Sequence, residues 1–265
     1  MVFKKILIAF LLLVLVKPLS AGDDFCGIRN YAFQSGEQIS FTVFYNVIGL
    51  YVNAGNATFT VNAEKLNNTP VYHLVGAGNS NSSYDWIFKV RDKYESYIDT
   101  ANLQPLKFLR NVDEGGYKIN ENVTFNRAAN TATSEKGTVK VPNCVQDVLS
   151  AIYYARNIDF QKYKPEDRIP FTMFLDNEVY NLYIKYLGKE TIKTRYGKFN
   201  AIKFKPLLVK GTLFEGGEKM TVWVSDDANH VPLRIESPIV VGSVKVDMMG
   251  YKNLRYPFSS LLSKR

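Results

Sequence analysis

The chain has 265 residues, of which 14% are aromatic and 22% charged, and its formal net charge is +8 at pH 7. This length can bury a sizeable core, either as one large β domain or as two smaller ones. The cations are scattered among acids and form no dense block with interleaved glycines and aromatics. We therefore expect a solvated surface and no nucleic-acid partner.

The first residues have the pattern of a secretory signal peptide. Lys4 and Lys5 precede an apolar run over residues 6–16, and small residues follow it up to Ala21 and Gly22. The run is shorter than the roughly 20 apolar residues that a spanning helix needs. We expect residues 1–21 to be removed by cleavage near Ala21, which leaves a periplasmic or secreted chain without a stable membrane span.

The sequence contains two cysteines, Cys26 and Cys144. In the oxidising compartment that an exported protein reaches, an even and minimal count favours one disulfide, here between the mature N-terminus and the middle of the chain. Two unpaired buried thiols are the alternative. A redox pair is disfavoured because the spacing is unlike Cys-x-x-Cys.

The mature chain is dominated by a period of two, which is typical of half-buried strands. In the stretch ISFTVFY, for example, Ile39, Phe41, Val43 and Tyr45 share one face. Similar segments cover residues 56–62, 71–75, 94–98, 106–110, 122–125, 182–187, 201–204, 220–224, 233–236 and 243–248. Clusters of Gly, Asn, Asp and Pro separate them, as in turns. Many short strands at near-regular spacing predict an antiparallel sheet that is closed or strongly curved.

One segment, residues 144–157, follows a helical period instead. Its apolar residues recur at intervals of three and one, which predicts an amphipathic helix packed on the core. Asn143 is the expected N-cap, with Gln146 three residues on as in a capping box. Asp147 would then lie in the first turn, where the helix dipole favours negative charge.

The stretch DTANLQPLKF, residues 99–108, has a near-copy in DDANHVPLRI, residues 226–235. Each copy places Asp and Asn in a turn after a strand, and Pro at the start of the returning strand, where a missing N–H does least harm. The turn residues concerned are Asp99, Asn102, Pro105, Asp226, Asn229 and Pro232. If the copies mark equivalent hairpins, residues 37–110 and 180–236 are related half-sheets. A chance match between turns of a β-rich protein is the alternative.

Together these elements predict a single β-rich domain over residues 22–265. The expected fold class is all-β and mainly antiparallel, a curved or barrel-like sheet built from two related half-sheets. The amphipathic helix over residues 144–157 would connect the two halves.

Several separated motifs carry a resemblance to one family. They are Gly36-Glu37 before a strand, NAGNATF, SYDWIFKVRDKYESYIDT, QDVLSAIYYARN, GKETIKTRYGKF, VWVSDDANHVPLRIES and VGSVKV. In this order, over residues 26–256, they resemble the exported bacterial family of domain of unknown function 3108. The resemblance implies an exported β-rich protein with no established activity, and offers no catalytic residues to carry over. More loosely, the hairpins are similar to those of periplasmic lipoprotein carriers of the LolA and LolB type, but fold alone does not establish function.

The sequence offers little reactive chemistry, so we expect no enzyme, no metal site and no cofactor. Neither His73 nor His230 has a second ligand at metal-binding spacing. Nucleophile-elbow and phosphate-loop motifs are missing from the sequence. A carboxylate pair such as Asp85 and Asp92 could serve glycoside hydrolysis only at the right separation, and turn or surface acids are the commoner case.

Aromatic residues are in excess, with 17 Tyr, 17 Phe and 2 Trp. On a curved sheet they could line a hollow for an apolar ligand, or simply complete a packed core. The candidate lining residues are Phe41, Val43, Trp86, Phe88, Tyr94 and Trp223. Two functions follow as hypotheses: carriage of a lipid or other amphiphile in the hollow, or a structural module that binds a protein or glycan partner in the cell envelope.

Overall fold

The computed structural model describes residues 26–47, 50–210, 216–239 and 242–265, so the predicted signal peptide lies outside the described residues. The strands are β1 (Gln38–Val47), β2 (Leu50–Leu66), β3 (Thr69–Ser80), β4 (Val90–Asp99), β5 (Pro105–Glu114), β6 (Tyr117–Asn126), β7 (Thr131–Ser134), β8 (Gly137–Lys140), β9 (Arg168–Leu175), β10 (Glu178–Lys193), β11 (Gly197–Pro206), β12 (Thr221–Ser225), β13 (Pro232–Pro238), β14 (Ser243–Lys252) and β15 (Leu261–Lys264). One α-helix, α1 (Val148–Ala155), and two short 3₁₀ helices, Ser82–Tyr84 and Phe160–Lys162, complete the described elements.

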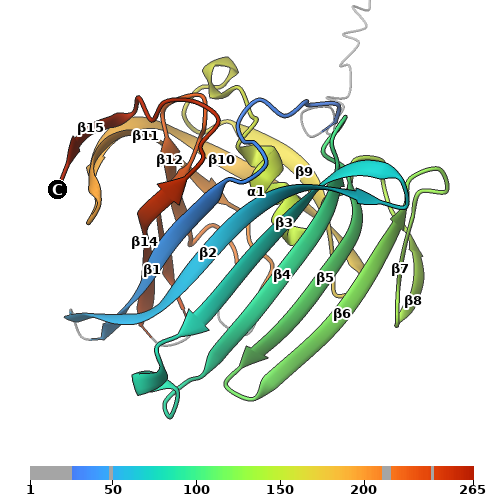
Figure 1. The fold of residues 1–265 in the computed structure, drawn as a ribbon, viewed down its shortest axis with the longest axis horizontal. Coiled ribbons are helices and arrows are strands. Elements are labelled where there is room, and N and C mark those ends of the chain that lie inside the picture. Colours follow the sequence, from blue (N-terminus) through green and yellow to red (C-terminus); the bar gives the residue numbers. More distant parts are fainter. Residues whose placement is uncertain (1–25, 48–49, 211–215, 240–241) are drawn as a thin grey trace, which may run out of the picture.

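All strands belong to one antiparallel sheet that curves around α1 (Figure 1). The strand order is β8-β7-β6-β5-β4-β3-β2-β1-β14-β13-β12-β11-β10-β9, and β15 pairs with β11. Thus β1 pairs with β14, and the first and last thirds of the chain join in the middle of the sheet. The predicted fold class, a curved and mainly antiparallel sheet with one helix, is confirmed.

The two ends of the sheet approach each other without forming a ladder. Beside β9, Gln146 makes an isolated parallel bridge to Met173. Ser134, at the end of β7, donates to the side chain of Asn177 in the β9–β10 turn. The sheet is therefore barrel-like but not closed, and only single contacts join its two ends among the described residues.

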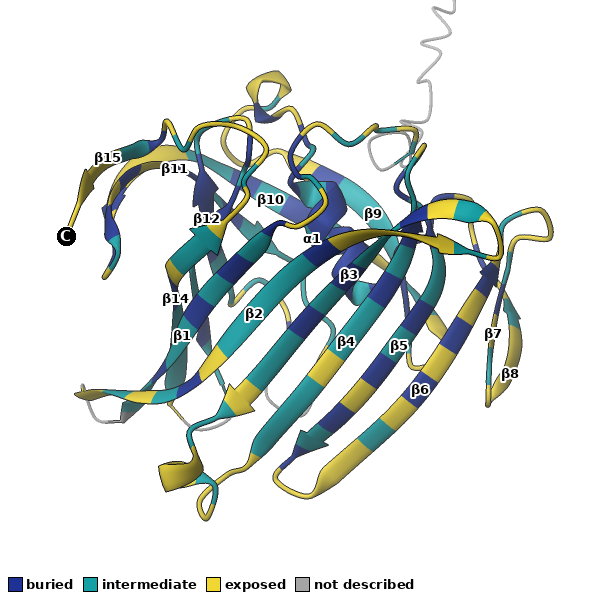
Figure 2. Cartoon of the chain, in the orientation of Figure 1, coloured by how far each residue is buried: buried dark blue, intermediate teal, exposed yellow. Residues whose placement is uncertain are grey.

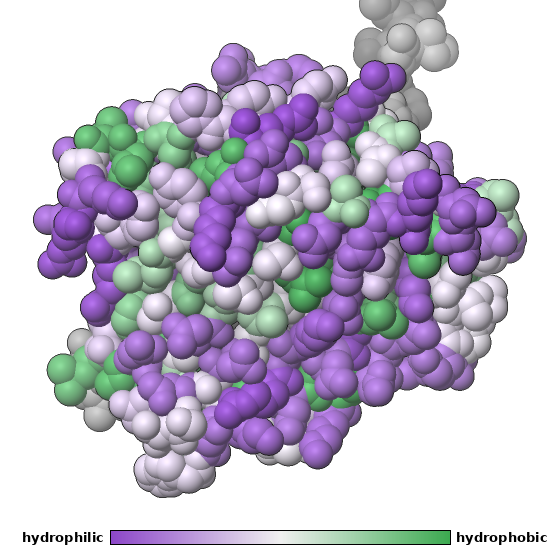
Figure 3. Space-filling model, viewed as in Figure 1, coloured by the Kyte–Doolittle hydropathy of each residue, from purple (hydrophilic) through white to green (hydrophobic). Residues whose placement is uncertain are grey.

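Burial follows the predicted period of two in most strands (Figure 2). In β6, residues alternate between exposed and buried from Glu121 to Asn126, because one face packs on the core and the other meets solvent. Hydrophilic side chains dominate the outer face over β3 to β6 (Figure 3). In β12, by contrast, Val222 to Ser225 are all buried, so both faces of the sheet are covered there.

The helix is shorter than predicted and begins four residues later. Asp147, not Asn143, is the N-cap: it accepts from the N–H groups of Leu149 and Ser150, and Ser150 Oγ accepts from the N–H of Asp147 to complete a capping box. The predicted start was wrong because Gln146 is extended, in a bridge to β9. Asp147 is fully buried and also accepts from Ser96 Oγ at 2.6 Å, which fixes the helix on β4.

The predicted disulfide between Cys26 and Cys144 is present. It joins the segment before β1 to the segment that leads into α1. The N-terminal segment is further held by Asn157, whose Oδ1 accepts from the N–H groups of Tyr31 and Ala32. These contacts bind the first described residues to both ends of the helix.

Both copies of the repeated stretch form the hairpin turns that the sequence predicts, between β4 and β5 and between β12 and β13. The equivalent residues Leu103 and His230 have positive φ angles of 58° and 42°, and each returning strand begins at the proline. Asp99 Oδ1 accepts from the N–H of Ala101, whereas in the second turn Asp227, one position further on, accepts from Asn229. That the two half-sheets are related as a repeat stays a prediction.

Candidate functional site

The concave face of the sheet below α1 is defined by the strand register, because cross-strand partners point to the same side. Phe41 pairs with Ala57, Ala57 with Gly78, Gly78 with Asp92 and Asp92 with Val112. The next row toward the helix runs Ile39, Phe59, Gly76, Tyr94, Arg110 and Glu121. The row farther from the helix runs Ile235, Val246, Val43 and Gly55. We call these three rows the concave face.

The packing on this face loosens with distance from the helix. Side chains fill the space beside Gly76: a Cβ there would lie 2.9 Å from the Phe59 ring and 3.4 Å from Leu149 of α1. Two residues further along β3, a Cβ at Gly78 would meet nothing within 4 Å. Its neighbour Ala57 is only half-buried, as is Val43 in the next row. The centre of the concave face thus leaves open space over small and apolar residues.

A pair of carboxylates, Asp92 and Glu114, lies on the β4–β5 side of this open space. Burial, together with the charge and hydrogen bond of Glu114, raises the pKa of Asp92 to about 7. The N–H of Asp113 opposes this rise by donating to Asp92 Oδ1 at 3.3 Å. Perturbed carboxylates of this kind are concentrated at functional sites, although ion-pair networks produce them too.

An arginine and two further acids lie beside that pair. Arg110 forms ion pairs with Asp176, from the β9–β10 turn, and with Glu121 at 2.9 Å. Burial raises the pKa of Glu121, and Arg110 opposes the shift. Among the described residues, Glu121 Oε1 and Arg110 Nε have no hydrogen-bond partner although both are buried. One side of the concave face is therefore apolar and the other side can accept and donate hydrogen bonds.

Exposed apolar side chains gather at the end of the sheet away from α1. They come from the β3–β4 connection and from the first residues of β2 and β6, along the lower edge of the sheet in Figure 1. We call them the aromatic rim, which consists of Leu50, Tyr51, Tyr84, Trp86, Ile87, Phe88 and Tyr117. The Phe88 ring lies against Gly115 in the β5–β6 turn, so neighbouring connections touch. The rim borders the less tightly packed end of the concave face.

The structure does not bring the six predicted lining residues together. Phe41, Val43 and Tyr94 lie on the concave face. Trp86 and Phe88 belong to the aromatic rim, where Trp86 is 82% exposed. Propensity places aromatics on strands but cannot tell a strand residue from one in the connection beyond it, and residues 81–89 form that connection.

Trp223 lies outside the three rows of the concave face. It pairs with Arg234, Arg234 with Asp247 and Asp247 with Thr42, whose side chain points away from its neighbour Phe41. The indole Nε1 donates to Glu190 Oε1 at 2.6 Å, and the ammonium of Lys203 lies 5.3 Å from the ring centroid. Trp223 is thus a packed residue of a buried cluster that also contains Phe41, Leu233 and Met248, and it lies outside the three rows of the concave face.

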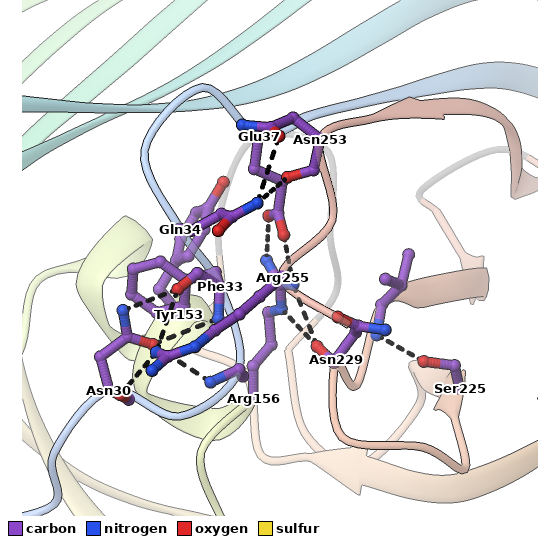
Figure 4. Close-up of polar contacts among 12 residues, drawn as sticks. Asn30, Phe33, Gln34, Glu37, Tyr153, Arg156, Ser225, Asn229, Asn253 and Arg255 are labelled. Atoms are coloured by element: carbon purple, nitrogen blue, oxygen red, sulfur yellow. Dashed lines mark hydrogen bonds and ion pairs between the residues drawn. The ribbon is translucent and has the colours of Figure 1, made fainter. Parts of the chain in front are cut away.

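Sequence reasoning missed a buried ion pair at the other end of the sheet (Figure 4). Arg156 donates to both carboxylate oxygens of Glu37, at 2.5 and 2.9 Å, and twice to the carbonyl of Asn229. The side chains of Arg156 and Glu37 are 3% and 0% exposed. The predicted turn residue Asn229 in turn binds the backbone of Tyr256. No solvent reaches these groups, so they hold four chain segments together and offer no binding surface.

The described part of the chain contains no group of three or more His, Cys, Asp and Glu side chains arranged to hold a metal. His73 contacts Glu64 at 3.0 Å and Glu95 at 3.2 Å and stacks on Tyr97. His230 packs against Phe160 and contacts the carbonyl of Arg156 through Nδ1. Within the same residues, no helix has the length and apolar character needed to span a membrane.

A solved structure with a similar fold is found among known proteins, together with two weaker similarities. A β-barrel-like protein of domain of unknown function DUF1849 from Brucella abortus is 8% identical, covers 86% of this chain and all of its own, and superposes with a TM-score of 0.55. Two weaker similarities are to a candidate exported protein of YmcC-like fold from Bacteroides fragilis and a candidate lipoprotein from Parabacteroides distasonis. They are 12% and 13% identical, each covers 85% of this chain and 99% of its own, and the TM-scores are 0.33 and 0.38.

The family of the chain is identified by its match to a family model. No curated protein matches the sequence. The model for proteins of unknown function of the DUF3108 type matches residues 40–249, which include all of the concave face except Ile39. Because this match spans most of the chain, the protein belongs to the DUF3108 family.

Proposed function

We propose that the protein is exported and binds an apolar or amphiphilic molecule of the cell envelope on its concave face, without catalysis. The observation that carries the proposal is the open space over Gly78, on a face whose row nearer the helix is closely packed at Gly76. Apolar walls with a few convergent polar groups are the usual composition of small-molecule sites. An acyl chain would lie along Phe41 and Val43, and a polar head would reach Arg110.

The aromatic rim supports the same proposal. Its side chains line the end of the concave face that α1 does not cover, so an apolar ligand could pass from one apolar surface to the other. Trp and Tyr suit such a position because each combines an apolar ring with a polar group that meets water. Carriage also agrees with the polar outer face of β3 to β6 (Figure 3).

The test compares two glycines that have equal free space on opposite faces of the sheet. Gly78 lies on the concave face, whereas Gly250 pairs with Ser40 on the outer face, and a Cβ at either meets nothing within 4 Å. Wild type, Gly78→Phe and Gly250→Phe are purified and examined by native mass spectrometry for co-purifying lipid. We expect wild type and Gly250→Phe to carry a bound species and Gly78→Phe to lose it. Repeated preparations of wild type without any adduct, or equal occupancy in all three, would refute the proposal.

The second candidate function is a module that binds a protein or glycan partner. The observation in its favour is the exposure of the rim, where Trp86 and Ile87 are 82% and 62% exposed. Large exposed apolar side chains mark interaction surfaces. In this case Trp86→Ala would abolish binding of the partner, and Gly78→Phe would leave it unchanged.

A further inference from the structure

Two open cavities lie outside the concave face, at the tip of the β10–β11 hairpin. They have volumes of about 430 and 400 Å³ and share Lys193, Thr194 and Arg265 in their walls. The first is completed by Thr191, Ile192, Gly197, Lys198, Ser263 and Lys264, and the second by Phe44, Tyr51, Arg195, Arg234, Lys245 and Asp247. Because they share walls, they form one groove between the hairpin tip and the outer face of β1, β14 and β13. We call it the cationic groove.

The groove has a strong excess of positive charge. Its walls contain seven cationic side chains and one carboxylate side chain. The carboxylate, Asp247, is 1% exposed and already accepts two hydrogen bonds from Arg234, at 2.7 and 2.9 Å. It is therefore neutralised within the fold and does not offset the other cations.

Five of the cations are exposed and have no partner carboxylate. Lys193, Arg195, Lys198, Lys264 and Arg265 form no ion pair with any described residue. Other surface lysines, such as Lys89, Lys93 and Lys189, do form ion pairs with nearby acids. Like charges held close together raise the local potential and favour an anionic ligand.

The fold holds these cations in place. Thr194 is buried, and its Oγ1 accepts from the N–H groups of Tyr196 and Gly197, which fixes the hairpin tip. The guanidinium of Arg195 lies 4.0 Å from the centroid of the Phe44 ring, and the backbone N–H of Arg195 donates to Asp247 Oδ2 at 3.4 Å. A site whose groups are positioned before the ligand arrives loses less conformational entropy on binding.

We propose that the cationic groove binds phosphate groups of an anionic ligand. Guanidinium and ammonium groups make charge-assisted hydrogen bonds to phosphate, and the hydroxyl of Ser263 can add a donor. The groove lies on the side of the sheet opposite to the concave face, and it meets the proposed carriage site only at Tyr51 of the aromatic rim. The phosphate can belong to a lipid headgroup or to a soluble molecule.

The test uses a triple variant and a control of equal charge. Lys193, Lys198 and Lys264 are changed to Gln in one protein, and the exposed Lys65, Lys118 and Lys136 in the other. Binding is measured by calorimetry with inorganic pyrophosphate, and by co-sedimentation with phosphatidylcholine vesicles that contain or lack phosphatidylglycerol. Circular dichroism and the unfolding midpoint check that all three proteins are folded.

We expect wild type and the control variant to bind, and the groove variant to lose about tenfold or more in affinity. Binding of pyrophosphate identifies a soluble phosphate ligand as sufficient, whereas binding of the phosphatidylglycerol vesicles alone identifies a headgroup; either result supports the proposal. Two results would overturn it: no binding of either probe by wild type, or equal losses in both variants, which would reflect net charge alone.

Discussion

Substitution of Arg156 by Met should remove a large part of the stability of the fold. Arg156→Met leaves the Glu37 carboxylate buried at 0% exposure without its two charge-assisted hydrogen bonds. It also removes two donors from the carbonyl of Asn229. Breaking a buried ion pair by deleting one partner costs about 3–5 kcal/mol, against a total stability of about 5–15 kcal/mol for a typical domain.

The measurement is urea unfolding followed by tryptophan fluorescence, with the disulfide intact. Lys93→Met is the matched control, because the Lys93 side chain is 54% exposed in its pair with Glu95 and such a pair contributes about 1 kcal/mol or less. The double variant Glu37→Gln with Arg156→Met should regain part of the loss, since no unpaired charge remains. If Arg156→Met costs no more than Lys93→Met, the account of this ion pair is wrong.

Three further predictions follow from features of the same fold. Replacing both Cys26 and Cys144 by Ala opens a loop whose ends are 118 residues apart, and should lower the free energy of unfolding by about 2–5 kcal/mol in denaturant titrations; an unchanged midpoint would contradict this. The pKa of Asp92 is raised to about 7, so the folded state binds a proton at this carboxyl more tightly than the unfolded state does. The stabilisation from Asp92 is therefore complete below about pH 4, and it is lost as the pH rises to 7. Asp92→Asn should flatten the dependence of the free energy of unfolding on pH between about pH 4 and 7. If the pH profiles of wild type and Asp92→Asn run parallel, Asp92 is not the group with the raised pKa. Gly76→Ala should cost about 1–3 kcal/mol by overpacking against the helix, whereas Gly78→Ala should be nearly neutral; equal costs would show that the space at the two glycines does not differ.

The sequence predicted the secondary structure well where side-chain period and turn chemistry decide the outcome. Both repeated turns are found where Pro105 and Pro232 place them. The helix start was misplaced because Asn143 and Asp147 both make good caps, and only the bridge of Gln146 to β9 decides between them. That bridge depends on tertiary structure, which local pattern does not contain.

The candidate site was much less predictable. Alternation alone assigned Trp223 to the lining of a hollow, but which face of each strand becomes concave depends on strand order and on bulges such as the one between Trp223 and Val224. The importance of Gly78 had no signal in the sequence, since Gly76 is the same residue two positions away and differs only in what packs over it. The pairing of Arg156 with Glu37 joins residues far apart in the chain, and no spacing rule links them.

The position of β1 in the sheet affects the order in which the protein can fold. Gln38 pairs with Lys252, so the central ladder joins residues about 200 positions apart and cannot form until nearly the whole chain is available. Until then β1 offers an unpaired edge that other chains could extend. Such distant pairing slows folding. A chain that crosses a membrane in extended form would benefit from this delay, because its sheet could close only after transport is complete.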